Sequence, residues 1–164
     1  MIEFRQCLLF DLEAVLELNQ RVYDSLADKS LLRLNSIEMI ASCLAEPNVT
    51  MGAWYGDKLV AIGILYVPQT DDEDLSHYVE NAVFPAANQK LYLVDAAYRG
   101  QGLQRIIIRL IEDIARKKGF VMLCTTIAPH NTFSINNFIA EGYTYSTTVV
   151  KYGGLKRNIY YKVL

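Results

Sequence analysis

The feature that most constrains the fold is a glycine-rich turn between an apolar run and a long amphipathic segment. The run Leu91–Val94 leads into Arg99-Gly100-Gln101-Gly102, and a helical stripe follows it. Apolar residues recur there at the spacing of one helix face: Leu103, Ile106, Ile107, Leu110, Ile111 and Ile114. Two lysines and Gly119 then mark the end of that helix. This stretch predicts a strand, a tight turn and a helix.

The turn is also suited to an anion. Gly100 and Gly102 leave backbone N–H groups uncovered by side chains, and the first amides of a helix attract negative charge. Neither G-x-G-x-x-G nor G-x-x-x-x-G-K-[ST] is present, so the two common nucleotide motifs are excluded. The alternative interpretation is a turn and a core helix without a ligand.

Composition narrows the classes of function. A length of 164 residues predicts one domain over 1–164, and 52% hydrophobic with 21% charged residues is typical of a globular protein. The net charge of −2 and the lack of a basic block argue against nucleic acid as a partner. No apolar run reaches transmembrane length, so no membrane partner is expected.

The cysteines and histidines indicate the compartment and argue against a metal. Cys7, Cys43 and Cys124 are odd in number and show no C-x-x-C spacing, which predicts free thiols in a reducing cytoplasm. With only two histidines in the chain, we expect no metal site.

The remaining elements follow from local patterns. A strand is predicted over Met1–Cys7, and a helix over Leu12–Asp24. A second helix is predicted between the cap Ser36 and Pro47. The later predictions are a hairpin of Val49–Tyr55 and Lys58–Val67, a long loop Gln69–Asn88 with one helical turn, strands Lys90–Asp95 and Val121–Ile127, a helix Asn131–Ala140, and a hairpin of Tyr143–Lys151 and Leu155–Val163. The strands on either side of the stripe helix should be parallel, so the fold class is α/β with a sheet of mixed direction.

Two motifs carry a resemblance to a known family. Arg99-Gly100-Gln101-Gly102-Leu103 resembles the pyrophosphate loop of the GNAT superfamily of N-acetyltransferases, whose motif is (Gln/Arg)-x-x-Gly-x-(Gly/Ala). Arg99 and Gly102 match that motif, whereas Gln104 replaces the usual small residue. The second acyl-CoA motif is similar to Asn131, which opens the last helix, and to the Gly142-Tyr143 pair that closes it. The order of elements follows the family layout over essentially the whole chain.

The resemblance implies a mixed, mostly antiparallel sheet with a central parallel βαβ unit, helices on both faces, and acetyl-CoA as co-substrate. It implies that the parallel strands splay and that pantetheine lies in the gap at their carboxyl ends, where α/β sheets bind ligands. The residues that it assigns to the cofactor are Tyr92, Leu93 and Val94 along pantetheine, Arg99, Gly100, Gln101, Gly102, Leu103, Gln104 and Arg105 at the pyrophosphate, Asn131 and Ser134 at the pantetheine arm, and Phe138 at the thioester end.

Catalysis is harder to assign from the sequence. Acetyl transfer to an amine requires a deprotonated amine, an oxyanion donor and a proton for the leaving thiolate. The resemblance makes the Val94 N–H a candidate oxyanion donor. The tyrosine acid of many relatives is Phe138 here, and the glutamate base of some relatives is Thr126. Thr126 is therefore a candidate for positioning a water, and the alternative is an ordinary β-branched strand residue.

The sequence leaves three functions open. The first is transfer of an acetyl group from acetyl-CoA to the primary amine of a small molecule. The alternatives are a protein N-acetyltransferase and a non-catalytic acyl-CoA-binding regulatory module. The acidic segment Asp71–Asp74 would attract a cationic acceptor, or would serve only as a solvated loop. The assembly is left open between a monomer and a homodimer.

Overall fold

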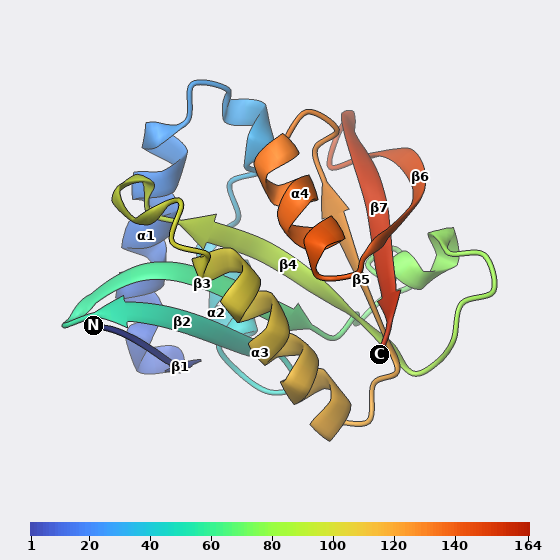
Figure 1. The fold of residues 1–164 in the computed structure, drawn as a ribbon, viewed down its shortest axis with the longest axis horizontal. Helices are drawn as coiled ribbons and strands as arrows, with labels where there is room; N and C mark the ends of the chain where they lie inside the picture. The colour runs from blue at the N-terminus through green and yellow to red at the C-terminus, as the bar shows by residue number, and fades with distance from the viewer.

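The computed structural model describes residues 1–164 and shows a seven-stranded sheet between two layers of helices (Figure 1). The strands lie in the order β1-β2-β3-β4-β5-β7-β6. Their bounds are β1 Ile2–Cys7, β2 Val49–Tyr55, β3 Lys58–Tyr66, β4 Ala86–Val94, β5 Met122–Ile127, β6 Thr144–Lys151 and β7 Leu155–Val163. The α-helices are α1 Leu12–Ser25, α2 Ile37–Cys43, α3 Leu103–Lys117 and α4 Thr132–Ala140.

The topology confirms the predicted fold class. β4 and β5 are the one parallel pair, and α3 connects them, so the predicted βαβ unit is present. Every other neighbouring pair in the sheet is antiparallel. The predicted bounds of the helices and of the other strands hold to within a few residues.

One boundary prediction is wrong. β4 begins at Ala86 rather than Lys90, so the last residues of the predicted loop belong to the sheet. Ala86 and Asn88 have low strand propensity, but pairing with Met122 and Cys124 of β5 holds them extended. The helical turn expected in the loop is a 3-10 helix, η3, at Leu75–Tyr78.

Each face of the sheet carries its own core. Along β3, Ile62 and Ile64 pack with α1 and α2, whereas Ala61 and Leu65 pack with α3, as the two-residue period of a strand requires. In Figure 1, α3 and α4 lie in front of the sheet and α1 and α2 behind it.

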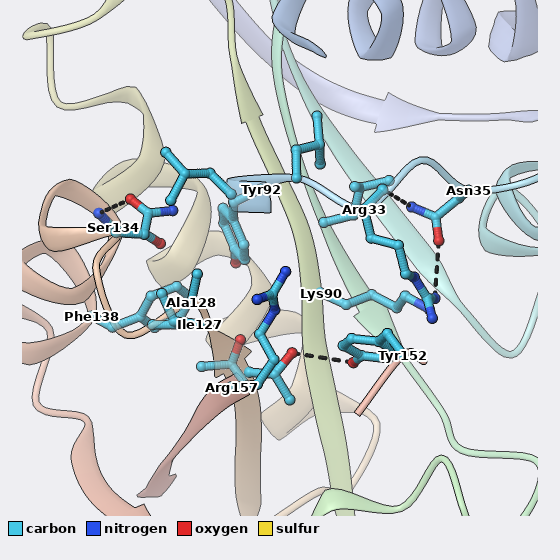
Figure 2. Close-up of a pocket in the computed structure, with 16 residues that line it drawn as sticks. Arg33, Asn35, Lys90, Tyr92, Ile127, Ala128, Ser134, Phe138, Tyr152 and Arg157 are labelled. Carbon is cyan, nitrogen blue, oxygen red and sulfur yellow. Dashed lines mark hydrogen bonds between the residues drawn. The ribbon is translucent and has the colours of Figure 1, made fainter. Parts of the chain in front are cut away.

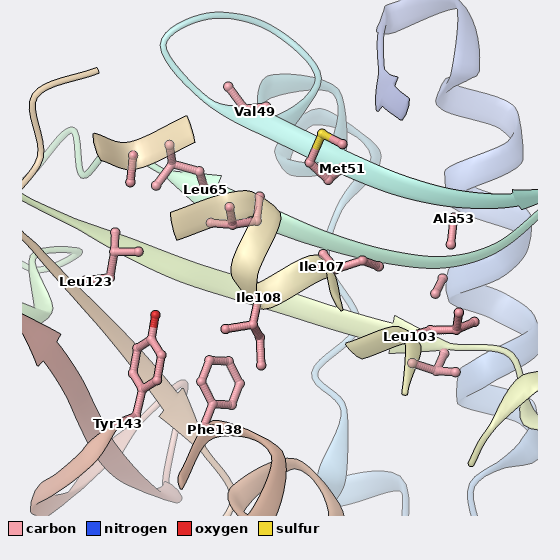
Figure 3. Close-up of a cluster of buried hydrophobic side chains, with 14 of the residues drawn as sticks. Val49, Met51, Ala53, Leu65, Leu103, Ile107, Ile108, Leu123, Phe138 and Tyr143 are labelled. Carbon is pink, nitrogen blue, oxygen red and sulfur yellow. The ribbon is translucent and has the colours of Figure 1, made fainter. Parts of the chain in front are cut away.

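The apolar stripe of α3 faces the core as predicted, but the centre of the buried face is rotated about the helix axis from the centre of the predicted stripe. Leu103, Ile107, Ile108 and Ile111 are buried, whereas Ile106, Leu110 and Ile114 lie at the border of the buried face. Figure 3 shows Ile108 directed towards the rings of Phe138 and Tyr143. The helix is therefore fixed against both the sheet and the segment that follows it.

The parallel strands diverge towards their carboxyl ends. β4 and β5 pair only from Ala86 and Met122 to Asn88 and Cys124, and Figure 1 shows the two arrows separating beyond that point. In β4 a bulge lies between the partners of Ile62 and Ile64, and Leu91 in it has a φ of +53°. A bulge bends its strand, so this one turns β4 away from β5. None of the helices has the length and hydrophobicity that crossing a membrane requires.

Candidate active site

Three adjoining cavities follow the gap between β4 and β5. We name them by position: the loop cavity of about 350 Å³ beside the glycine turn, the central cavity of about 120 Å³ between the strands, and the outer cavity of about 480 Å³ beyond them. The loop and central cavities share Tyr92 and Ser134. The central and outer cavities share Lys90 and Tyr152. A ligand entering at the turn and another entering from the outer cavity would therefore meet at the central cavity.

The glycine turn has the open backbone that the sequence predicts. Gly100 and Gly102 have φ of 81° and 74°, and a methyl group added to either would meet no atom within 4 Å. The glycines are therefore required by the backbone conformation and not by packing. The Asp95 carboxylate, which accepts a hydrogen bond from the Ala97 amide at 3.0 Å, fixes the start of the turn.

Gln104, the departure from the motif, does not crowd the turn. Its side chain is buried, and its Nε2 donates to the Ser134 Oγ at 2.9 Å. Its Oε1 accepts from the Asn137 Nδ2 at 3.2 Å. Gln104 therefore ties the start of α3 to α4, so that both helix N-termini border the loop cavity.

The structure brings together most of the residues assigned to the cofactor. Those that line the loop cavity are Tyr92, Leu93, Val94, Arg99, Gln104, Asn131 and Ser134. The other residues assigned to the pyrophosphate line none of the three cavities, namely Gly100, Gln101, Gly102, Leu103 and Arg105. The Leu103 side chain is buried in the core, and Arg105 pairs with Glu141 at 2.7 Å. At those five positions only the backbone or the outer surface of the turn remains available to a pyrophosphate.

The Val94 amide faces the gap. Val94 lies opposite Ala61 of β3, and the following amide, that of Asp95, donates to the Val60 carbonyl at 2.8 Å. In an antiparallel ladder this pattern makes Val94 and Ala61 a non-hydrogen-bonded pair. The Val94 N–H therefore points away from β3, towards the side from which β5 has diverged.

Phe138 and Thr126 both line the central cavity. Phe138 is buried, and its ring stands edge-on to Tyr92 and Tyr143, with centroids 5.3 and 5.0 Å apart. It offers no proton. The Thr126 Oγ1 lies 3.2 Å from the Tyr152 hydroxyl, so this side chain holds a second polar group at the cavity.

The sequence analysis missed every cationic side chain of the central cavity and its second tyrosine, namely Arg33, Lys90, Arg157 and Tyr152. Tyr152 occupies the turn of the β6–β7 hairpin, and its ring lies under the Arg33 guanidinium at 4.0 Å. Burial lowers the pKa of Lys90 and that of Arg157. Burial also raises the pKa of Tyr92, so its hydroxyl stays protonated. A tyrosine before Gly153-Gly154 was the one local signal, and nothing in it places that turn at the gap.

Half of the acidic segment has a structural role. The Glu73 carboxylate accepts from the Tyr66 hydroxyl and from the Gln69 amide, and the Asp74 carboxylate caps η3 through the Ser76 amide at 2.9 Å. Asp71 and Asp72 are exposed. No three histidine, cysteine, aspartate or glutamate side chains gather in an arrangement that could hold a metal ion.

The family model that matches this chain and three solved structures that it resembles are all of acetyltransferases. The model of the acetyltransferase (GNAT) family matches residues 12–141. The fold resembles the ribosomal-protein-S18-alanine N-acetyltransferase from Escherichia coli, with 20% identity, 99% of this chain and 94% of that chain covered, and a TM-score of 0.74. It also resembles an acetyltransferase of the GNAT family from Streptococcus pneumoniae, with 15% identity, 100% and 99% coverage, and a TM-score of 0.77. The putative acetyltransferase yncA from Salmonella typhimurium, solved with acetyl-CoA, gives 17% identity, 100% and 94% coverage, and a TM-score of 0.73. No curated protein matches the chain.

Proposed function

Because this chain belongs to the acetyltransferase (GNAT) family and is an acetyl-CoA-dependent N-acetyltransferase, we propose that its acceptor is the primary amine of a small molecule. The observation that carries this proposal is the cover over the central cavity. Arg33, in the segment between α1 and α2, stacks on Tyr152 of the β6–β7 hairpin. Arg157 of β7 donates to the Ser30 carbonyl at 2.9 Å. The segment between α1 and α2 and the β6–β7 hairpin thus meet over the gap between β4 and β5, on the side of the outer cavity.

The cavities divide the two substrates between two entrances. Acetyl-CoA would place its pyrophosphate over Gly100–Gly102 and its pantetheine along Tyr92–Val94, opposite Asn131 and Ser134. Its thioester would then reach the central cavity. The acceptor would enter through the outer cavity, whose volume of about 480 Å³ suits a small molecule.

The groups along the loop and central cavities suit acetyl transfer. When the amine nitrogen attacks the thioester carbonyl, negative charge develops on the carbonyl oxygen, and the Val94 N–H is directed towards that side of β4. When the carbon–sulfur bond breaks, the thiolate needs a proton. The Tyr152 hydroxyl beside Thr126 is the donor that we assign to this step.

An extended peptide fits this arrangement less well. A protein acetyltransferase requires an open groove across the gap, whereas here the contact between Arg33 and Tyr152 spans it. The similar ribosomal-protein alanine acetyltransferases share the fold at 20% identity, which carries no information on the acceptor.

An acceptor panel tests the proposal. Purified protein and acetyl-CoA are incubated with pools of small amines, amino acids and short peptides, and release of the CoA thiol is followed, with mass spectrometry of the product. We expect turnover with small amines and little with peptides. Turnover with peptides alone would favour the protein acetyltransferase. Acetyl-CoA binding by calorimetry without turnover of any amine would favour the regulatory module.

A further inference from the structure

The central cavity has an unbalanced charge. Its lining contains three cationic side chains, Arg33, Lys90 and Arg157, and no aspartate or glutamate. None of the three forms an ion pair within the protein. Cations that converge on one small cavity without a carboxylate are the usual means of holding an anion.

Arg157 is the strongest member of this group. It is only 5% exposed, and its guanidinium donates to the carbonyls of Lys156 and Ser30, both at 2.9 Å. Both acceptors are neutral, so the buried charge is hydrogen-bonded but not neutralised. Burying an unpaired charge is costly, and a bound anion would offset that cost. Figure 2 shows the guanidinium extending into the cavity between Tyr92 and Lys90.

The other two cations are held by neutral groups. The Lys90 ammonium lies over the Tyr66 ring at 4.3 Å and 3.7 Å from the Met39 sulfur. The Arg33 guanidinium lies over the Tyr152 ring and donates to the Asn35 side chain at 3.1 Å. These contacts orient the two side chains and leave their charge available.

The nearest carboxylates belong to the outer cavity. They are Asp72, which is exposed, and Glu73, which is engaged by the Tyr66 hydroxyl and the Gln69 amide. Neither lies within 4.0 Å of a nitrogen of the three cations, since no such ion pair is present. Glu73 still interacts electrostatically with Lys90, so the uncompensated positive charge of the central cavity rests chiefly on Arg157 and Arg33.

The cation cluster is at the wrong end of the gap to serve the phosphates of acetyl-CoA. Lys90 and Val94 are separated by four positions of β4, about 13 Å at the usual rise of a strand, and the glycine turn lies beyond Val94. The cluster is on the far side of the site proposed for the thioester. The anion that it holds would therefore belong to the acceptor.

We propose that the acceptor is an amine that also carries a carboxylate, held by Arg157 together with Lys90 and Arg33. This inference rests on the proposed function. The central and outer cavities, of about 120 and 480 Å³, together have room for such an acceptor. Binding there would direct the acceptor nitrogen towards the hydroxyls of Thr126 and Tyr152. The inferred acceptor is thus anionic at one end, in contrast to the cationic acceptor that the acidic segment alone would favour.

The same cations would assist the chemistry. Positive charges near an ammonium disfavour its protonated form, so an amine beside Lys90 and Arg157 would lose its proton more readily than in water. This would provide the neutral nucleophile without a glutamate at the position of Thr126. The same cationic side chains would then bind the carboxylate of the acceptor and favour the neutral form of its amine.

Matched acceptors test the inference directly. Leucine, leucinamide and 3-methylbutylamine share a carbon skeleton and differ in the carboxylate, and the same comparison is made for other amino acids that turn over. We expect kcat/KM to be at least 30-fold higher for each amino acid than for its carboxamide or its decarboxylated amine. This order is the reverse of the one that amine basicity alone would give for leucine and leucinamide, because the amine of leucinamide loses its proton more readily. Equal or higher values for the neutral amines would overturn the inference and leave the proposed function intact. A preference for aminophosphonates over the matched carboxylates would overturn the carboxylate assignment.

Substitutions of the cations test whether these side chains bind the carboxylate of the acceptor. Lys90→Met and Arg157→Lys should raise KM for the carboxylate acceptor at least tenfold, with a much smaller loss of kcat/KM for its carboxamide and unchanged KM for acetyl-CoA. Lys156→Met, which removes an exposed cation next to Arg157, is the matched control. Thermal unfolding checks each variant, and Lys90→Met serves if Arg157→Lys does not fold. Loss of carboxylate and carboxamide turnover in equal measure would contradict the inference, and acetylation of no amine at all would overturn the proposed function with it.

Discussion

Gly102 combines a left-handed backbone with empty space above it. Its φ of 74° is strained for any residue with a β-carbon, and no atom lies where that carbon would be. Gly102→Asp would place a negative charge where the pyrophosphate is proposed to lie. We predict that the Kd for acetyl-CoA rises tenfold or more, as measured by calorimetry, in a protein that still folds.

The control for this variant is another open glycine. Gly56, in the β2–β3 turn, also has a positive φ, of 58°, and no neighbour near its β-carbon position. Gly56→Asp therefore introduces similar strain and the same charge away from the site. Equal acetyl-CoA affinity in the two variants would show that the turn at Gly102 does not bind the phosphates.

Tyr152 provides the second prediction at this scale. Tyr152→Phe removes the hydroxyl beside Thr126 and keeps the ring under Arg33. If the hydroxyl protonates the thiolate, kcat should fall about 100-fold with unchanged KM for acetyl-CoA, since general acids contribute factors of that order. Steady-state kinetics measure both constants. Tyr145→Phe, at an exposed tyrosine outside the cavities, is the control, and unchanged kcat in Tyr152→Phe would assign the proton to another group.

At the scale of elements, the site depends on the bulge in β4. The bulge sets Leu91 and Tyr92 opposite Gly63 of β3, and the Tyr92 ring lies where a side chain on Gly63 would be. A β-carbon on Gly63 would come within 2.4 Å of the Tyr92 ring and 2.7 Å of Ile107. The absence of a side chain at Gly63 therefore helps to set the position of the strand that borders all three cavities.

Gly63→Ala should therefore damage stability and binding together. We predict a loss of about 1–3 kcal/mol in the free energy of unfolding and weaker acetyl-CoA binding as Tyr92 is displaced. Gly52→Ala, where a β-carbon would meet the Cys7 sulfur at 2.6 Å, creates a similar clash in β2, away from the gap. Urea unfolding and calorimetry on both variants separate the effects. An equal loss of affinity in the two would indicate a global cause.

Elements with a local signal could be predicted from the sequence, and the others could not. The β2–β3 hairpin follows from Gly56-Asp57, and the βαβ unit follows from two apolar runs around the stripe of α3. The start of β4 was missed because Ala86 and Asn88 are extended only through pairing with β5, a partner more than thirty positions away. The bulge at Leu91 has no local signal either.

For the molecule as a whole, the acceptor side of the site is built by contacts between distant segments. Arg157 bonds to the Ser30 carbonyl across 127 positions of the chain, and Arg33 stacks on Tyr152 across more than a hundred. The cofactor motifs are contiguous in sequence and could be identified from it. The cation cluster is assembled only by the fold, so no pattern in the sequence could have placed Lys90 beside Arg157.

Acid should weaken the folded molecule through Asp11 at the start of α1. Hydrogen bonds from the Arg5 guanidinium, at 2.9 and 3.0 Å, and from the Leu8 amide, against the opposing effect of burial, hold the pKa of this carboxyl below its usual range. A lowered pKa stabilises the fold above the ordinary value of about 4, and this contribution is lost as pH falls through the folded value.

The variant Asp11→Asn tests this effect. It should melt at a lower temperature than the wild type at pH 7, and the difference should shrink as pH falls towards 3. Thermal unfolding from pH 3 to 7 measures it, with Asp71→Asn, at an exposed aspartate, as the control. A constant difference across that range would show that the carboxylate charge is not responsible.

The most direct test of the account is a crystal structure of the protein with CoA. The pyrophosphate should lie over Gly100–Gly102, the pantetheine should be hydrogen-bonded to the β4 backbone near Val94, and the sulfur should lie at the central cavity near Thr126 and Tyr152. The cation cluster should lie beyond the sulfur, free of CoA phosphates. A pyrophosphate bound by Arg33, Lys90 or Arg157, or a CoA outside the gap between β4 and β5, would contradict the account.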